Sequence, residues 1–168
     1  LRPDDAGQSA VARRMGVLVR ELVDAARQFD PLPAAAVAGL VGLGPGLTPD
    51  GDDFLVGFLT GLRCTTGGNE VRSKWLSDLR KAVMRSSRRT NDISRTYLYH
   101  ASRGQVAGSL SALAGAIAGG ETPDRLLLIA EEAITENADK ILVGDPVEGT
   151  CWSDMTSRLK FIKTGSST

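Results

Sequence analysis

The feature that most limits how this chain can fold is a glycine- and proline-rich run at residues 42–49, followed at once by three aspartates. Glycine recurs along the run, and it adopts positive φ and lets the backbone approach its neighbours closely. Asp50, Asp52 and Asp53 come next, and acidic side chains favour the first turn of a helix. Residues 54–62 are then almost all apolar. The pattern predicts a tight turn that opens a central, buried helix.

The rest of the chain also carries helical signals, because apolar residues recur every three or four positions and glycine or proline interrupts them. Thr122 is the expected N-cap of a helix that has proline at its first position. Residues 34–41 suit either a helix or a strand. The predicted fold class is all-α, a multi-helical bundle. We expect its helices over 9–29, 54–62, 70–89, 92–102, 106–118 and 123–137, with a last short helix after Gly149.

Length and composition indicate one domain over residues 1–168, because a chain of this size can bury one core and needs no second. Residues 164–168 read as a frayed tail. Aromatic residues make up only 5% of the chain, so the core must come from Ala, Val, Leu and Ile. The inward face expected for residues 70–89 consists of Val71, Trp75, Leu76, Leu79, Val83 and Met84.

Net charge and cysteine count exclude several classes of protein. A formal net charge of zero argues against general attraction to nucleic acid or to an anionic membrane. No apolar run approaches the roughly 20 residues that span a bilayer, so no membrane segment is expected. Cys64 and Cys151 are too few for a disulfide framework and indicate a reducing compartment. We therefore expect a cytoplasmic protein.

Charge is nevertheless segregated along the chain. Between Arg72 and Arg103, nine Lys or Arg stand against two Asp, a net of +7. Between Glu121 and Glu148, eight acids stand against two bases, a net of −6. These stretches are either two solvated helix faces or, for the basic one, a surface that attracts an anionic substrate or an acidic partner.

The turn itself is the candidate site. Backbone N–H groups around Gly44 and Gly46 and at the helix start could hold an anion. Three acids within four residues repel one another and suit a hard cation better than a bare phosphate. Asp50, Asp52 and Asp53 are therefore candidate ligands of Mg²⁺, which would bridge to an anionic substrate. A general acid and base pair is the alternative, if burial raises the pKa of one carboxyl group.

The same residues would also make a good helix start without any chemistry. Thr48 would be the N-cap, Pro49 the first helical residue, and the acids would favour the helix dipole. Capping needs only one or two of these groups. Three acids and three glycines exceed that need and favour a functional site, with Thr48, Asp52 and Asp53 as the candidate catalytic residues.

A second stretch resembles this turn. Residues 48–57 align without gaps to residues 135–144, with five identities in ten positions. Either two similar turns share a ligand, which makes Asp139 a fourth candidate metal ligand, or two apolar helix starts resemble one another by chance.

Residues 42–55 read Gly-Leu-Gly-Pro-Gly-Leu-Thr-Pro-Asp-Gly-Asp-Asp-Phe-Leu. This run resembles the motif of a bacterial family long classed as a domain of unknown function, some of whose members are a subunit of oxamate carbamoyltransferase, the enzyme of anaerobic allantoin breakdown. Fourteen positions match with one difference, Asp50 where the family usually has serine. Arg89 with Thr90, and Ser94 after Ile93, also resemble the family's pattern. The resemblance covers about residues 35–145.

The resemblance implies transfer of a carbamoyl group between carbamoyl phosphate and oxamate, in a complex with other subunits. Both substrates are anions, and Arg88, Arg89, Thr90 and Ser94 are the candidate groups that bind them. Two departures stand out. The family's second turn, usually Gly-His-Ser-Ser-Gly-x-Asp, keeps only Asp139 here. The family is also longer at its N-terminus, so this chain is expected to lack an N-terminal domain of the family.

Three hypotheses therefore stand side by side. The chain is a carbamoyltransferase subunit or a subunit of a related small-anion transferase, a stand-alone Mg²⁺-dependent hydrolase of a small anionic substrate, or a non-catalytic scaffold subunit whose glycine turn is a packing device. Assembly into a homo-oligomer is compatible with each of them.

Overall fold

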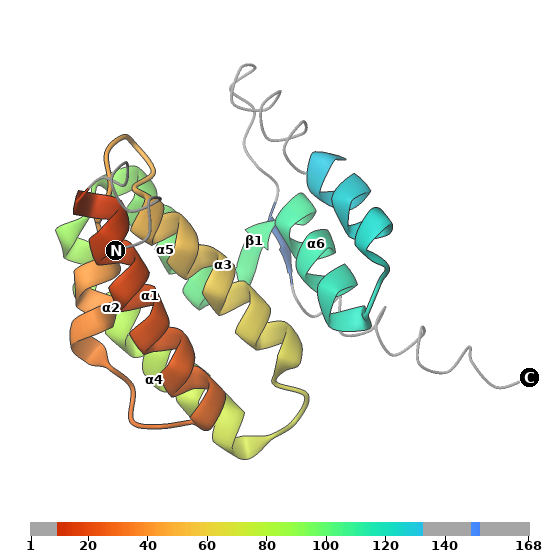
Figure 1. Cartoon of the computed structure of the whole chain (residues 1–168), viewed down its shortest axis with the longest axis horizontal. Helices are drawn as coiled ribbons and strands as arrows, with labels where there is room; N and C mark the ends of the chain where they lie inside the picture. Colours follow the sequence, from red (N-terminus) through yellow and green to blue (C-terminus); the bar gives the residue numbers. More distant parts are fainter. Residues whose placement is uncertain (1–9, 133–148, 152–168) are drawn as a thin grey trace, which may run out of the picture. The chain divides into compact units, whose positions relative to one another are not determined.

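The computed structural model describes residues 10–132 and 149–151, and most of them lie in helices (Figure 1). The predicted all-α fold class is thus confirmed. Residues 123–132 are helical. The other elements are α1 (Ala10–Gln28), α2 (Ala34–Leu40), α3 (Asp50–Thr65), α4 (Glu70–Ser86), the 3-10 helix η2 (Ser87–Arg89), α5 (Asp92–Ser102), β1 (Gln105–Ala107), α6 (Gly108–Gly119) and β2 (Gly149–Cys151).

Backbone contacts divide the chain into two compact units. The first contains the described residues of Leu1–Leu59 and Gly68–Ser102, and the second contains those of Thr60–Gly67 and Arg103–Thr168. The prediction of one domain over residues 1–168 stays a prediction. The expected tail at 164–168 lies outside the described residues.

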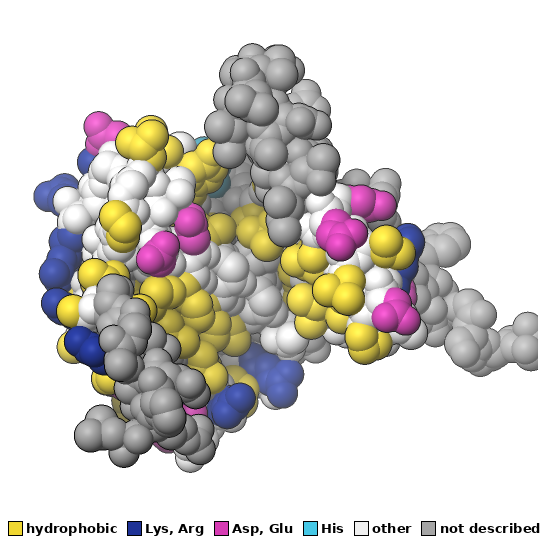
Figure 2. Space-filling model, turned by 45° about the horizontal axis from the view of Figure 1, so that its top comes forward, with side chains coloured by type: hydrophobic (Ala, Val, Ile, Leu, Met, Phe, Trp, Pro, Cys, Tyr) yellow, Lys and Arg dark blue, Asp and Glu magenta, His cyan; other side chains and the backbone are white. Residues whose placement is uncertain are grey.

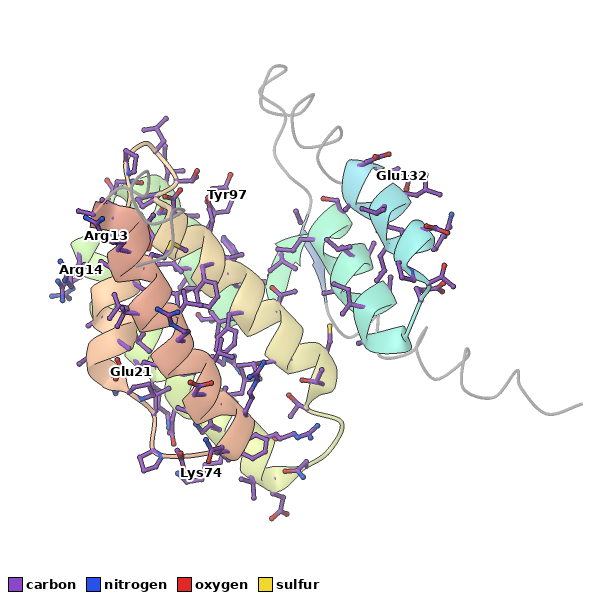
Figure 3. All side chains as sticks on the ribbon, in the orientation of Figure 1. Arg13, Arg14, Glu21, Lys74, Tyr97 and Glu132 are labelled. Atoms are coloured by element: carbon purple, nitrogen blue, oxygen red, sulfur yellow. The ribbon has the colours of Figure 1, made fainter. Side chains whose placement is uncertain are left out.

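In the first unit, α1 is an amphipathic helix that buries its apolar face. Leu22 is fully buried and Ala26 nearly so, whereas Arg13 and Arg14 are exposed and project outward (Figure 3). Phe29 follows the helix with a φ of 54°, a left-handed conformation that commonly ends helices. The helix thus ends just before the two prolines that the sequence places there.

Residues 34–41, which suited either helix or strand, form the short helix α2. Its Ala36, Val37 and Leu40 are buried, and it packs against α1 and α4. The structure therefore selects the helical alternative and places α2 in the core directly before the glycine turn.

The inward face predicted for α4 is largely confirmed. Trp75, Leu76, Leu79 and Val83 are buried. Val71 was also predicted to face inward, and this was wrong, because Val71 is 58% exposed. Val71 lies in the first turn of α4, next to the Asn69 cap whose side chain accepts a hydrogen bond from Arg72 N, and this end of the helix extends past the core.

Only one face of α3 is fully buried. Leu55 and Leu59 are buried together with Asp52. Phe54 and Phe58 are half-buried and stack on each other, with ring centroids 5.4 Å apart. The turn opens a helix, as predicted, but only one face of that helix is buried.

The second unit contains a two-stranded antiparallel sheet, in which Val106 of β1 pairs with Thr150 of β2. The helix expected from residue 106 therefore begins at Gly108, after the strand. Gly149–Cys151 form the strand β2, and the last short helix expected after Gly149 lies outside the described residues. The predicted cap is confirmed, since the Thr122 hydroxyl accepts a hydrogen bond from the Arg125 N–H at 3.4 Å.

Cys64, near the end of α3, is half-buried and free. Burial raises the pKa of its thiol to about 11, partly offset by the positive charge of Arg63. Among the described residues, no helix combines the length and the apolar character that a membrane crossing requires.

Candidate functional site

The glycine run forms the tight turn that its composition predicts. Gly42, Gly44 and Gly46 have φ values of 73°, 123° and 92°, which favour glycine. A Cβ on residue 44 would lie 2.7 Å from the backbone nitrogen of Asp50, and one on residue 42 would lie 2.8 Å from the carbonyl oxygen of Arg89. A Cβ on Gly46 would meet open space. The first two glycines therefore allow a close approach of backbones, and the third leaves the loop surface open.

The end of α2 and the start of α3 meet beside this turn. The Gly51 N–H donates to the carbonyl oxygen of Leu43 at 2.9 Å. A Cβ on Gly51 would lie only 2.1 Å from the carbonyl oxygen of Leu40. No side chain fits in that space, so the glycine in the acidic segment is needed for packing between the two helices.

Asp52 ties the turn to a distant part of the chain. Its residue is 1% exposed. One carboxylate oxygen, Oδ1, accepts the Gly42 N–H at 2.9 Å, and the other, Oδ2, accepts the Thr90 hydroxyl at 2.5 Å. Because both oxygens bond within the protein, the expectation that Asp52 meets substrate or metal finds no support in this geometry, which gives Asp52 a positioning role.

A second set of hydrogen bonds also links the turn to the residues that follow η2. The carbonyl oxygen of Leu47 accepts hydrogen bonds from Asn91 Nδ2 at 2.9 Å and from Ser94 Oγ at 3.2 Å. Asn91 also caps α5, because its Oδ1 accepts the Ser94 N–H at 3.0 Å. The sequence analysis did not identify Asn91 as a site residue. Its position directly before the helix expected from residue 92 was the available signal, because asparagine is a common N-cap.

Asp53, unlike Asp52, lies on the exposed side of α3. Partial burial of its carboxyl group raises the pKa, a hydrogen bond from Thr48 lowers it, and the charges of Asp52 and Asp50 raise it further, so that the pKa lies above its usual 3.8. In the interpretation without chemistry Thr48 caps this helix, whereas in the structure the helix begins at Asp50 and the Thr48 hydroxyl donates to the Asp53 carboxylate. The condition for a general acid or base in this turn, a carboxyl group with a raised pKa, is met at Asp53.

The metal prediction gains no geometric support. In the part of the chain that the structure describes, no three His, Cys, Asp or Glu side chains gather in a way that would hold a metal ion. Asp52 turns inward while Asp50 and Asp53 are exposed, so the three carboxylates do not converge. Asp139, the fourth candidate ligand, lies outside the described residues.

The two candidate anion-binding arginines lie next to the turn. Arg88 and Arg89 belong to η2, directly before Thr90, and both are exposed. Neither forms an ion pair with another described residue. A Cβ on Gly42 would lie 2.8 Å from the Arg89 carbonyl oxygen, and Thr90 donates to Asp52. The structure thus brings the turn, Thr90 and the backbone of Arg89 together, while the anion-binding role of the two arginines stays a prediction.

Replacing Asp53 by asparagine should stabilise the protein at pH 7. The folded-state pKa of Asp53 lies above the unfolded value, so folding disfavours the charged form, and this cost grows as pH rises from 3.8 through the folded pKa. Asparagine removes the charge and keeps an acceptor for Thr48. Urea unfolding should give a higher midpoint for Asp53→Asn at pH 7 and a smaller difference at pH 4.5.

The matched control is Asp24→Asn on α1, whose exposed carboxylate has only a loose ion pair of 3.9 Å with Arg27. Its midpoint should change little at either pH. An Asp53→Asn gain that stays constant with pH, or a loss at pH 7, would contradict the account of this carboxyl group.

Comparison with known proteins identifies the family. No curated protein and no solved structure matches the chain. The family described as oxamate carbamoyltransferase subunit AllH matches residues 40–137, which is more than half of the chain. The matched part includes the glycine turn, η2, and the residues whose hydrogen bonds connect the turn to Thr90, Asn91 and Ser94. The resemblance found in the turn thus extends over every described residue of the candidate site, and the chain belongs to the oxamate carbamoyltransferase subunit AllH family.

Proposed function

We propose that this chain is a subunit of a carbamoyltransferase that acts on oxamate and carbamoyl phosphate, or of a related small-anion transferase. The observation that carries the proposal is the family match over residues 40–137. The geometry supports it, because the matched region is built around one turn that two sets of hydrogen bonds hold against η2 and α5.

The substrate anions would meet Arg88 and Arg89. A guanidinium presents a planar fork of donors that fits carboxylate and phosphate oxygens, and these two are exposed and without an ion pair among the described residues. The open backbone around Gly46 offers space for a substrate next to the turn. Binding two anions here would place them side by side, which lowers the entropic barrier to transfer.

Asp53 is the group proposed to handle the proton. In carbamoyl transfer the amide nitrogen of oxamate forms a bond to the carbonyl carbon of carbamoyl phosphate, the bond from that carbon to the phosphate oxygen breaks, and phosphate leaves. The nitrogen must lose one proton, and a carboxylate with a raised pKa is a suitable acceptor. Thr48 would hold this carboxylate in place through its hydrogen bond.

One observation favours a second candidate, a scaffold subunit without catalytic groups. Asp52, the most buried acid of the turn, uses both carboxylate oxygens inside the protein, as a packing device would. The Mg²⁺-dependent hydrolase has no such support, since the described carboxylates do not gather around a metal position.

Capture of partner subunits separates these functions. The chain, tagged and expressed in cells that contain the other subunits, should capture them, and carbamoyl transfer from carbamoyl phosphate to oxamate should appear in the captured complex and not in the chain alone. A hydrolase would release phosphate when alone. A scaffold would give a complex whose activity is the same with parent chain or with Asp53→Asn, and that result would contradict the proposed role of Asp53.

A further inference from the structure

Three exposed arginines lie one turn apart where α4 passes into η2. Arg85 is in the last turn of α4, and Arg88 and Arg89 follow in η2. The backbone between them stays helical, since Ser86 has φ −86° and ψ −14° and Ser87 has φ −60° and ψ −19°. Residues three and four apart in a helix lie on the same face. The three side chains therefore share one face, and we call them the arginine triad.

Within the described residues, nothing neutralises the arginine triad. None of its three side chains forms an ion pair there. Every other Lys or Arg between residues 72 and 95 has a partner. These partnered bases are Arg72, Lys74, Arg80, Lys81 and Arg95. Like charges one turn apart repel each other, so the triad is a concentration of uncompensated positive charge.

The position of the triad at a helix end explains only part of this charge. A base in the last turn of a helix interacts favourably with the helix dipole, and Arg85 alone supplies that charge to α4. The two arginines of η2 add repulsion to it. Lys and Arg side chains also gather along one edge of the first unit (Figure 2), and such a concentration of positive charge attracts anions.

The backbone that carries the triad is held by hydrogen bonds. The Ser87 hydroxyl, in a residue that is 3% exposed, donates to the Met84 carbonyl oxygen at 2.9 Å. Directly after η2, the Thr90 hydroxyl donates to the buried carboxylate of Asp52. Both bonds exist without a ligand. Binding at the triad therefore needs little ordering of the backbone, which favours affinity.

The chemistry of the triad fits a phosphoryl group better than a carboxylate. A guanidinium offers a planar fork of N–H donors and no acceptor. A carboxylate has two oxygens and one charge, and one fork satisfies it. A phosphoryl group has three acceptor oxygens and about two negative charges, so it can use several forks at once.

We propose that the arginine triad binds a phosphoryl group, and that Arg85 is the residue that makes this site select a phosphoryl group over a carboxylate. For the substrate the inference rests on the proposed function, since carbamoyl phosphate and the phosphate that leaves it both carry such a group. Arg85 was not among the residues expected to bind anions. It extends the site from η2 by one helical turn along α4.

Titration of the full chain with inorganic phosphate tests the site, with the arginine Nε–H signals followed by NMR at pH 7 and constant ionic strength. The signals of Arg85, Arg88 and Arg89 should shift together. Arg85→Ala should raise the Kd for phosphate roughly tenfold, because charge-assisted hydrogen bonds are lost, and should change the Kd for oxamate much less.

Arg13→Ala is the matched control, because Arg13 is also an exposed arginine without an ion pair among the described residues but lies on α1. It should leave both Kd values unchanged. An unchanged Kd for phosphate in Arg85→Ala would overturn the proposal. Equal losses for phosphate and oxamate would overturn the role of Arg85 in selection.

Carbamoyl phosphate as a second titrant separates the substrate from free phosphate. Its Kd should rise by the same factor in Arg85→Ala, and a rise for inorganic phosphate alone would overturn the assignment to the substrate. These titrations use the chain alone and need no transfer activity. Binding of both ligands that depends on Arg85, together with a captured complex that transfers no carbamoyl group, would support the arginine triad and contradict the proposed function.

Discussion

Replacing Asp52 by alanine is expected to lower the free energy of unfolding by roughly 3 kcal/mol, because two hydrogen bonds to a buried charged group are lost and each contributes at least about 1.5 kcal/mol. The Gly42 N–H and the Thr90 hydroxyl lose their acceptor. Both groups lie beside a residue that is 1% exposed, so water cannot easily replace the carboxylate. Urea unfolding followed by circular dichroism measures the change.

Asp53→Ala is the control for this experiment, since it removes the same side chain one position along the same helix turn. The Asp53 residue is largely exposed, and partial burial of its carboxyl group raises the pKa, so its removal should cost little or should stabilise the protein at pH 7. Equal losses in the two variants would mean that any acid in the turn stabilises the helix start through its charge alone, and the account of Asp52 would be wrong.

Gly51→Ala is the second substitution expected to have a large effect. The new Cβ would lie 2.1 Å from the Leu40 carbonyl oxygen, which is backbone and cannot rotate away. To accept it, α2 and α3 must move apart and disturb the hydrogen bond between the Gly51 N–H and Leu43. We expect a loss of about 3 kcal/mol or more, at the upper end of what overpacking costs.

Gly57→Ala is the matched control in the same helix, because no atom lies within 4 Å of the position of its Cβ. Alanine there should stabilise α3 by about 0.5 to 1 kcal/mol through helix propensity. Opposite signs for the two substitutions are the expected result. A gain at both positions would show that α2 and α3 do not approach each other as closely as described.

Much of the fold follows from local sequence patterns. The 3.6-residue period predicted α1, α4 and α5 within a few residues of their observed ends, and the Thr122 cap predicted the start of the last described helix. These features depend on residues close together in the chain. The strand at Gln105 could not be predicted in this way, because its partner Cys151 lies far along the chain.

The candidate site was only partly predictable for the same reason. The glycine spacing predicted a turn with positive φ, and all three glycines of the turn have positive φ. Asp52 is buried and Asp53 is exposed because it is the Asp52 carboxylate that points toward Thr90, 38 residues away in the chain. The sequence shows three equivalent acids there, and only the approach of Asp52 to Thr90 in the folded chain buries one of them, while Asp53 stays exposed.

The contrast between the buried Asp52 and the exposed side chains beside it connects the fold to the proposed function. Asp52 and Asn91 hold the turn against the region that begins with η2, and that region carries Arg88 and Arg89. A buried charge tied by two hydrogen bonds forms a rigid support. The exposed groups next to it are then free to meet the anions that a carbamoyltransferase must bring together.

The most direct test is the rate of carbamoyl transfer by the captured complex when it contains Arg88→Ala combined with Arg89→Ala. Arg13→Ala combined with Arg14→Ala is the control, since these arginines are also adjacent and exposed but lie on α1 (Figure 3). We predict that kcat/KM for carbamoyl phosphate falls at least tenfold, or about 1.4 kcal/mol, in the first complex only. Equal kcat/KM in both complexes would contradict the assignment of the substrate site to the glycine turn and η2.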